Sequence, residues 1–472
     1  MNSHTNLTNP MVKVKTVYIC NSCAYETPKW AGKCPECGSW NSFEETEIRP
    51  SQQQKGASRE HNSPRLLSEG TDTPDIRIVS GINEFDRVLG GGVFPGSVSL
   101  IAGDPGIGKS TLLLQVSGEF VKKNKKVLYV SAEESFRQIR GRAKRLELID
   151  FPLPLLVETE LEEILFQIEQ QDPDVVIIDS IQAVFSQNVS GAPGNVSQIR
   201  ECSSRLFRTA KEKGWSLFLV GHITKEGSIA GPKILEHMVD VVIYFEGDSL
   251  YQYRILRSLK NRYGPTHELG LFLMDQEGLK EVQNPSQLFI SHTEEIRTGA
   301  SITCSFEGSR PILVEVQALV SRTNYGIPQR TVSGFDQKKL ALILAILEKH
   351  CGLNFSFYDV FIKIAGGLRI DDPGIDLSIA AAIHSSLVNQ PLEAKAVFIG
   401  EIGLNGDVRP VSQMDRRIEE AVKLGFNRVF MPEINLHKIK KIGVDQIHSI
   451  KTISALINQK NSHQRTRVSE TL

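Results

Sequence analysis

Residues 103–110 have the types and spacing of a loop that binds the phosphates of a nucleoside triphosphate. The segment reads Gly103, Asp104, Pro105, Gly106, Ile107, Gly108, Lys109 and Ser110, followed by Thr111, and it fits G-x-x-x-x-G-K-[ST] at every required position. Its glycines let backbone N–H groups close around phosphates at a helix N-terminus. Lys109 is expected to reach the terminal phosphates of ATP, and Ser110 to bind Mg²⁺. A chance glycine-rich turn is the alternative, which the apolar run before the motif and the helical pattern after it disfavour.

Carboxylates farther along the chain suit the same site. Residues 174–179 form an apolar run that ends in Asp179, where a strand would deliver an acid to Mg²⁺. Residues 127–131 read as another buried strand, and Glu133 and Glu134 follow it, at the edge where open α/β sheets bind ligands. We expect Glu133 to orient the attacking water. At least one of the two acids then serves only as a favourable first-turn residue of the next helix.

The N-terminal region carries two C-x-x-C pairs, formed by Cys20, Cys23, Cys34 and Cys37. This pattern predicts a tetrahedral structural Zn²⁺ site, whose metal would contribute most of the folding free energy of a unit so poor in apolar residues. A redox role is the weaker alternative, because there are two pairs and no adjoining βαβ pattern.

The elements that must position these residues fall into successive regions. The chain has 472 residues, 40% hydrophobic and 23% charged, with a net charge of −1, which neither demands nor excludes a nucleic-acid partner. Without a signal peptide or a membrane-spanning run, we expect a cytoplasmic protein with no membrane partner. The predicted regions are a zinc finger at 1–45, a flexible linker at 46–75, an α/β domain with a mainly parallel sheet at 76–284, an α+β domain at 285–460 and a disordered tail at 461–472.

The glycines that precede the phosphate loop, at 81, 90–92 and 96, resemble the pattern of the RecA-like branch of P-loop proteins. In RecA-like proteins the loops after the later strands face a central channel and meet DNA. The resemblance therefore makes residues 186–197 and 224–231 candidate DNA-binding loops that a ligand would order, with plain surface loops as the alternative. His222, at a strand end, is either a sensor of the γ-phosphate or an ordinary strand-end histidine.

A basic box, Lys260, Asn261, Arg262, Tyr263 and Gly264, carries the most specific resemblance. Zinc knuckle, RecA-like core and this box in this order resemble the RadA family of bacterial DNA repair proteins, whose box reads K-N-R-F-G with phenylalanine in place of Tyr263. Lys260 and Arg262 would offer two cations, as an arginine finger does, to the nucleotide of a neighbouring subunit. A basic surface strand is the alternative.

The C-terminal domain resembles the proteolytic domain of Lon at residues 398–402, Gly406 and Pro410. Residues 396–408 read as a hairpin. Aspartates, Asp376 and Asp415, stand where the family has its serine nucleophile and lysine base, and Ser378 lacks an obvious base, so we expect a non-proteolytic domain. Its surface cations, expected to serve assembly or DNA contact, are Lys363, Arg369, Arg416 and Arg417.

The RadA resemblance implies a ring of identical subunits, expected to be a hexamer. Such a ring would be a DNA-dependent ATPase and helicase that acts on single-stranded and branched DNA and drives branch migration in homologous recombination, with the RecA recombinase as partner. The implied cofactors are ATP, Mg²⁺ and Zn²⁺. Two other classes stay open: an ATP-dependent Lon-type protease, and a KaiC-like regulatory switch whose turnover ignores DNA.

Overall fold

The computed structural model describes residues 15–20, 25–36, 38–48, 76–222, 234–247, 253–290, 297–323, 326–433 and 446–458. The chain divides into two compact units, Met1–Val282 and Gln283–Leu472. Outside the described residues lie Cys23, Cys37, the linker beyond Ile48, the loop at 224–231 and the tail at 461–472. The N-terminal region is a small antiparallel sheet of order β2-β1-β3, which extends three residues past the predicted end of this region, with bounds β1 Lys15–Cys20, β2 Glu26–Thr27 and β3 Phe43–Ile48.

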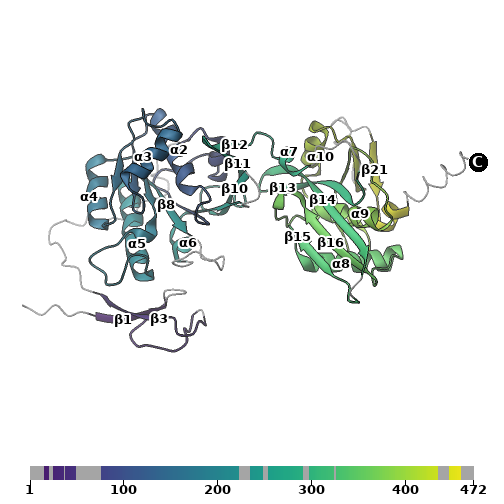
Figure 1. Cartoon of the computed structure of the whole chain (residues 1–472), viewed down its shortest axis with the longest axis horizontal. Helices are drawn as coiled ribbons and strands as arrows, with labels where there is room; N and C mark the ends of the chain where they lie inside the picture. The colour runs from purple at the N-terminus through teal and green to yellow at the C-terminus, as the bar shows by residue number, and fades with distance from the viewer. Residues whose placement is uncertain are drawn as a thin grey trace, which may run out of the picture. The chain divides into compact units, whose positions relative to one another are not determined.

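The rest of the first unit alternates strands and helices, as the sequence predicts for an α/β core (Figure 1). Its elements are α1 Asn83–Val88, β4 Val98–Gly103, α2 Lys109–Lys122, β5 Val127–Ser131, α3 Phe136–Arg145, β6 Leu155–Val157, α4 Leu161–Gln171, β7 Val175–Asp179, the short 3₁₀ helix η2 Ile181–Ala183, α5 Val196–Lys213, β8 Ser216–His222, α6 Ile234–Met238, β9 Val241–Glu246, β10 Tyr253–Asn261, β11 Leu269–Asp275 and β12 Gly278–Glu281.

One nine-stranded sheet organises this core, in the order β12-β11-β10-β9-β4-β8-β7-β5-β6. The six strands from β9 to β6 are parallel, which confirms the predicted mainly parallel sheet, while β10, β11 and β12 extend it antiparallel. The central strands β4, β5 and β7 are mostly apolar and are buried throughout, because helices cover both faces. Helices α1, α2 and α3 pack on one face, and α4, α5 and α6 on the other.

The second unit is α+β. A mixed seven-stranded sheet, in the order β15-β16-β14-β13-β17-β20-β21, packs against α9 and α10. Its elements are α7 Ser286–Phe289, β13 Ala300–Glu307, β14 Arg310–Arg322, β15 Arg330–Ser333, α8 Gln337–Cys351, β16 Tyr358–Ile364, η3 Ala365–Gly367, η4 Pro373–Ile375, α9 Asp376–Leu387, β17 Ala396–Phe398, β18 Glu401–Ile402, β19 Val408–Arg409, α10 Met414–Lys423, β20 Arg428–Pro432 and β21 Gln446–Ile450.

Two expectations for this unit are wrong in detail. The hairpin predicted over residues 396–408 is only the short pair β18–β19, because β17 lies between β13 and β20 in the main sheet and pairs parallel to both. Arg417, expected among the surface cations, is only 1% exposed. Its Nη1 donates to Oδ2 of Asp372 at 2.6 Å, so this cation serves the interior of the unit and is not available to DNA.

Candidate nucleotide site

The phosphate loop joins β4 to α2, in the position that the motif predicts. Gly108 adopts φ 117° directly before the first helical residue, a left-handed conformation that favours glycine. The Nζ of Lys109 donates to the carbonyl oxygens of Gly103 at 2.8 Å and Asp104 at 2.9 Å, so the ammonium lies inside the loop. Burial lowers the pKa of Lys109 to about 8, although the carboxylates of the site, led by that of Asp179, act in the opposite direction.

Asp179 ends β7 beside this loop and is 8% exposed. Its Oδ2 accepts a hydrogen bond from the hydroxyl of Tyr129 at 2.7 Å, and the hydroxyl of Ser110 also bonds to the carboxylate. Burial raises the pKa of Asp179, and these two hydrogen bonds partly offset that rise. The two predicted Mg²⁺ ligands therefore lie together, and their hydroxyl and carboxylate oxygens are the donors that Mg²⁺ prefers.

Tyr129 was not singled out in the sequence. It lies in the apolar strand β5 and is fully buried, where a tyrosine hydroxyl needs a hydrogen-bond partner. A tyrosine within a buried apolar strand is thus the sequence signal that could have identified Tyr129.

The structure separates the roles of Glu133 and Glu134. Glu133 accepts a short hydrogen bond from the hydroxyl of Ser180 and lies 3.4 Å from the Nε2 of His222. The hydrogen bond from His222 is the largest cause that lowers the pKa of Glu133, which keeps the carboxylate ionised. Glu134 turns away and forms a 2.7 Å ion pair with Arg142 of α3. Glu133 is therefore the carboxylate that faces the strand ends, and Ser180 is a partner that sequence reasoning missed.

The basic box lies at the opposite end of the sheet's strands from the phosphate loop. We call these two ends of the strands the two edges of the sheet. Because β10 runs antiparallel to β9, its last residue, Asn261, pairs with Val241. Val241 in turn pairs with Ser99, four residues before Gly103. At about 3.3 Å per strand residue, the box is on the order of 13 Å along the sheet from the phosphate loop of the same chain. Lys260 and Arg262 thus do not join the nucleotide site of their own subunit.

Within the box, the two cations are held differently. The Nζ of Lys260 donates to the carbonyl oxygens of Glu236, His237 and Val239 at 2.7, 3.2 and 2.7 Å, and so holds the end of α6. Burial lowers its pKa, and nearby Arg262 adds to that effect. The Arg262 side chain is 57% exposed, with its Nη1 3.8 Å from Oδ1 of the buried Asp240. Of the two cations, Arg262 is therefore the one whose guanidinium is more available to a neighbouring molecule.

The remaining box residues fix the turn. Asn261 accepts at its Oδ1 from the backbone N–H of Tyr263 at 2.9 Å. The Tyr263 ring stacks on Phe94 at 4.1 Å, and its hydroxyl accepts from Lys211 at 3.0 Å, so the hydroxyl that phenylalanine lacks has a partner. A Cβ on Gly264 would lie 3.0 Å from the Cα of Gly90, a contact tighter than most Cβ atoms make, which favours glycine.

The candidate DNA loop at 186–197 is tied to the core. The Oε1 of Gln198 accepts a hydrogen bond from the backbone N–H of Ser186 at 2.9 Å, and its Nε2 donates to the carbonyl oxygen of Val189 at 2.7 Å. These two hydrogen bonds tie the loop to the first turn of α5. The loop follows β7, which bears Asp179, and so connects to the nucleotide edge.

Two predicted zinc ligands can be placed. Cys20 and Cys34 are buried in one small apolar cluster with Phe43. The backbone N–H of Gly38 donates to the carbonyl oxygen of Cys34 at 2.9 Å, which closes the tight turn of the second C-x-x-C pair. Two thiols buried in one small cluster fit the tetrahedral site that the sequence predicts.

Of the positions compared with the Lon peptidase, Asp376 and Ser378 are buried, whereas Asp415 is exposed. Oδ1 of Asp376 lies 2.6 Å from the Nζ of Lys339. Burial raises the pKa of Asp376, although Lys339 acts to lower it. The hydroxyl of Ser378 lies 2.6 Å from that of Ser301, which is not a base able to activate it. Asp415 lies in the first turn of α10.

Three family models match parts of the chain. An AAA domain matches residues 65–228, a rubredoxin metal binding domain residues 18–45, and the subunit ChlI of Mg-chelatase residues 318–435. The first two coincide with the phosphate-loop core and the cysteine pairs. Among solved structures, one ATPase domain aligns with 45% of this chain and 93% of its own at 16% identity and a TM-score of 0.39, which carries no weight for function.

Curated relatives match nearly the whole chain. The DNA repair protein RadA of Bacillus subtilis is 48% identical over 433 residues, which cover 90% of this chain and 94% of the relative. Those of Listeria monocytogenes and Streptococcus pyogenes serotype M1 are 45% and 46% identical, each over 95% of this chain and 99% of the relative. In the part of the chain that the structure describes, no helix is long and apolar enough to cross a membrane. With its phosphate-loop ATPase core and zinc ribbon, the chain belongs to the RadA family of DNA repair proteins.

Proposed function

We propose that this chain is a DNA-dependent ATPase that assembles into a ring, with six subunits as the expected number, and uses ATP hydrolysis to drive branch migration of recombination intermediates. The observation that carries the proposal is the division of the hydrolytic parts between opposite edges of one sheet. Lys109, Asp179 and Glu133 gather at one edge, whereas Arg262 lies at the other. A complete site then needs two copies of the chain, with the box of one facing the phosphate loop of the next.

Each residue has a defined task in this arrangement. Lys109 and the backbone of residues 103–111 hold the phosphates, and Ser110 and Asp179 hold Mg²⁺. When bound, the metal neutralises charge on the β- and γ-phosphate oxygens. Glu133 orients water while Ser180 and His222 hold its carboxylate.

The cations of the neighbouring subunit complete the proposed site. Arg262, which is mostly exposed, stabilises the charge that develops on the transferred phosphoryl group. Lys260 reaches the same phosphates only after it releases the three carbonyl oxygens at the end of α6. ATP binding in the neighbouring subunit would therefore move α6, the helix that follows the candidate DNA loop at 224–231.

The DNA-related part of the proposal rests on the relatives and on the sheet. The curated relatives are named as DNA repair proteins. The candidate loop at 186–197 leaves the sheet directly beyond Asp179 and η2, so a DNA strand at this loop would lie next to the hydrolytic site. We propose single-stranded and branched DNA as substrates, the RecA recombinase as partner, Zn²⁺ in the N-terminal ribbon and the cytoplasm as location.

Complementation between two inactive variants tests the shared site. ATP hydrolysis by the full chain is measured with and without single-stranded DNA. Arg262→Ala and Lys109→Ala should each abolish DNA-stimulated hydrolysis, because every site then lacks one partner. When the two variants are co-expressed in equal amounts, about one quarter of the interfaces would combine an intact phosphate loop with an intact Arg262, and activity should return to that fraction.

A matched control removes the only route to recovery. Lys109→Ala combined with the double variant Lys109→Ala/Arg262→Ala has no intact phosphate loop, so no activity should return. Failure of the first mixture to recover activity would refute the shared site. Hydrolysis by the wild type that is unaffected by DNA would refute the DNA motor and leave the regulatory switch in its place.

A further inference from the structure

A basic hollow of about 520 Å³ lies in the ATPase core, at the edge of the sheet opposite the phosphate loop. Five of its lining side chains are cationic and two, Asp172 and Asp174, are anionic, which gives the lining a net charge of +3. This contrasts with the net charge of −1 of the whole chain. We call the five cations the basic edge: Arg77, Lys123, Lys125, Lys126 and Lys213.

The topology of the sheet gathers these cations from separate turns. Residues 122–126 read Lys-Lys-Asn-Lys-Lys and connect α2 to β5. Residues 211–213 read Lys-Glu-Lys at the end of α5, just before β8. Because β5 and β8 lie on either side of β7 and run parallel to it, both lysine-rich turns emerge at the same edge.

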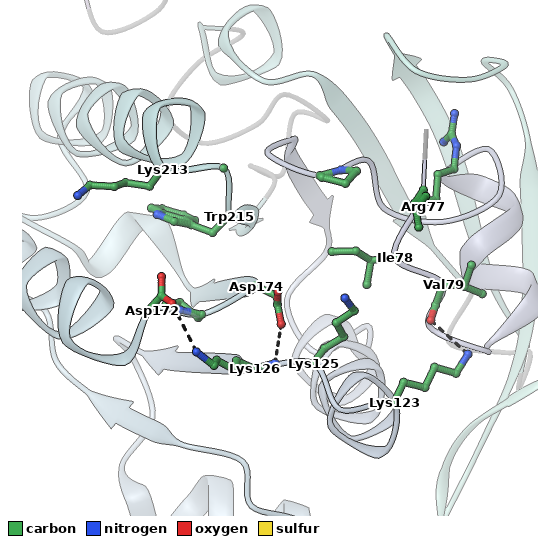
Figure 2. A pocket seen from close by; sticks show the side chains of 14 residues that line it. Arg77, Ile78, Val79, Lys123, Lys125, Lys126, Asp172, Asp174, Lys213 and Trp215 are labelled. Atoms are coloured by element: carbon green, nitrogen blue, oxygen red, sulfur yellow. Dashed lines mark hydrogen bonds and ion pairs between the residues drawn. The ribbon is translucent and has the colours of Figure 1, made fainter. Parts of the chain in front are cut away.

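Two cations of the basic edge are engaged within the subunit, because Arg77 donates to the carbonyl oxygens of Leu89 and Gly92, and Lys123 to that of Val79. The charges of the other three are weakly used by the protein itself. Figure 2 shows the Lys125 side chain extending between Ile78 and Asp174, and no described residue pairs with its ammonium. Lys126 lies 3.4 Å from Asp172, with side chains 65% and 90% exposed, and Lys213 is equally far from Glu169. Exposed pairs of this kind contribute about 0–1 kcal/mol, so a polyanion can replace them.

A simpler explanation covers only part of the cluster. Lysines in the last turn of a helix complement the partial negative charge of its C-terminus, which accounts for Lys123 after α2 and Lys213 in α5. Lys125 and Lys126 lie beyond α2 and directly before β5, so the helix dipole does not explain them. The acids do not neutralise the cluster, because only two of them, Asp172 and Asp174, line the hollow against five cations.

We propose that the basic edge binds the phosphodiester backbone of a second nucleic-acid strand, separated from the strand at the loop 186–197. This inference rests on the proposed function, in which the substrate is branched DNA. The candidate loop leaves the sheet at the phosphate-loop edge, whereas Lys125, Lys126 and Lys213 lie beside β5, β7 and β8, away from the box at the end of β10 that faces the neighbouring subunit in the proposed ring. Trp215, the aromatic residue of the hollow, is 5% exposed and cannot stack on a base. Recognition is therefore through phosphates and carries no sequence preference.

The test compares a fork that has two single-stranded arms with a linear oligothymidine strand. Affinities of the full chain are measured across a series of salt concentrations, for wild type and for Lys125→Gln/Lys213→Gln. Each phosphate contact contributes about 0.7 to the slope of log affinity against log salt, so the double variant should lower the slope for the fork by about 1.4. Its slope for the linear strand should not change. Lys349→Gln, an exposed lysine of α8 in the other unit, is the matched control.

Two outcomes of this test would overturn the inference. An unchanged slope for the fork would show that no strand contacts these lysines, and an equal loss for fork and linear strand would place them on the first strand's path. Hydrolysis stimulated by the linear strand is measured in the same samples and should be equal in variant and wild type. Its absence in the wild type would refute the proposed function instead, which keeps the two failures distinct.

Lysine acetylation followed by mass spectrometry gives an independent measurement. The fork should protect Lys125 and Lys213 from acetylation, whereas the linear strand and inorganic tripolyphosphate at the same phosphate concentration should not. Protection by tripolyphosphate as strong as that by the fork would identify a site for free phosphate groups and overturn the assignment to a strand.

Discussion

Arg417 allows a sharp stability test of the second unit, because its charge is buried and paired. Its Nη1 lies 2.6 Å from Oδ2 of Asp372 and 2.6 Å from the carbonyl oxygen of Cys304, and its Nε donates to that of Ser412 at 2.9 Å. Substitution with alanine leaves the Asp372 carboxylate in the interior without its counter-charge. We therefore expect Arg417→Ala to lower the free energy of unfolding of this unit.

The surroundings of the carboxylate set the size of the effect. Removing one partner of a buried ion pair costs about 3–5 kcal/mol. Asp372 keeps two backbone donors, the N–H groups of Phe306 at 2.7 Å and Gly374 at 2.8 Å, so we expect the low end, about 3 kcal/mol. The adjacent Arg416 is exposed, donates to the carbonyl oxygen of Ser309 and lies over the Phe306 ring, and it has no buried charge partner among the described residues, so Arg416→Ala should cost less than about 1 kcal/mol.

Urea unfolding of the full chain measures this difference with two probes. The three tryptophans, Trp30, Trp40 and Trp215, all belong to the first unit, so their fluorescence follows that unit alone. Far-ultraviolet circular dichroism follows both units. Arg417→Ala should shift the unfolding transition of the second unit, which circular dichroism detects, and leave the fluorescence-detected transition of the first unit unchanged.

The outcome that would refute this reasoning is a loss no larger than that of Arg416→Ala. A further variant checks the cause. Adding Asp372→Asn to Arg417→Ala should restore part of the stability, because the uncompensated buried charge is then gone.

Three further predictions concern the first unit. His222→Ala removes the main cause that lowers the pKa of Glu133, so the carboxylate should protonate at higher pH. The acid limb of the pH–rate profile for ATP hydrolysis should then move to higher pH, and a limb at the wild-type pH would contradict the contact. Nucleotide affinity, measured by titration without metal, should fall as the pH rises through about 8, because Lys109 then loses its proton; affinity independent of pH would exclude this ionisation. Gly264→Ala should cost about 1–3 kcal/mol in the fluorescence-detected transition, because the new Cβ would meet the backbone of Gly90; wild-type stability would show that the turn can relax.

Much of the fold could be predicted because its signals are local. The continuous apolar runs of β4, β5 and β7 and the phosphate loop between strand and helix are readable within a few residues. The position of β17 could not be predicted, since its partners β13 and β20 are distant in sequence. The burial of Arg417 has the same cause, because Asp372 lies 45 residues away and the charge pattern of α10 alone favours a surface.

The candidate site divides in the same way. Lys109 and Ser110 follow from motif spacing, while the choice between Glu133 and Glu134 depends on tertiary partners, Ser180 and His222 for one and Arg142 for the other. The attachment of Lys260 to α6 is likewise a contact between separate elements. The catalytic roles of these residues stay predictions until the hydrolysis measurements are made.

The antiparallel direction of β10 has a consequence for how activity depends on assembly. If the box serves the adjacent subunit, a single copy of the chain has no complete site, and hydrolysis should rise more steeply than in proportion to protein concentration. A hexamer that opens at one interface to admit DNA would lose one site and keep about five sixths of its turnover. The orientation of one strand would thus make the rate of ATP hydrolysis a direct count of intact subunit contacts.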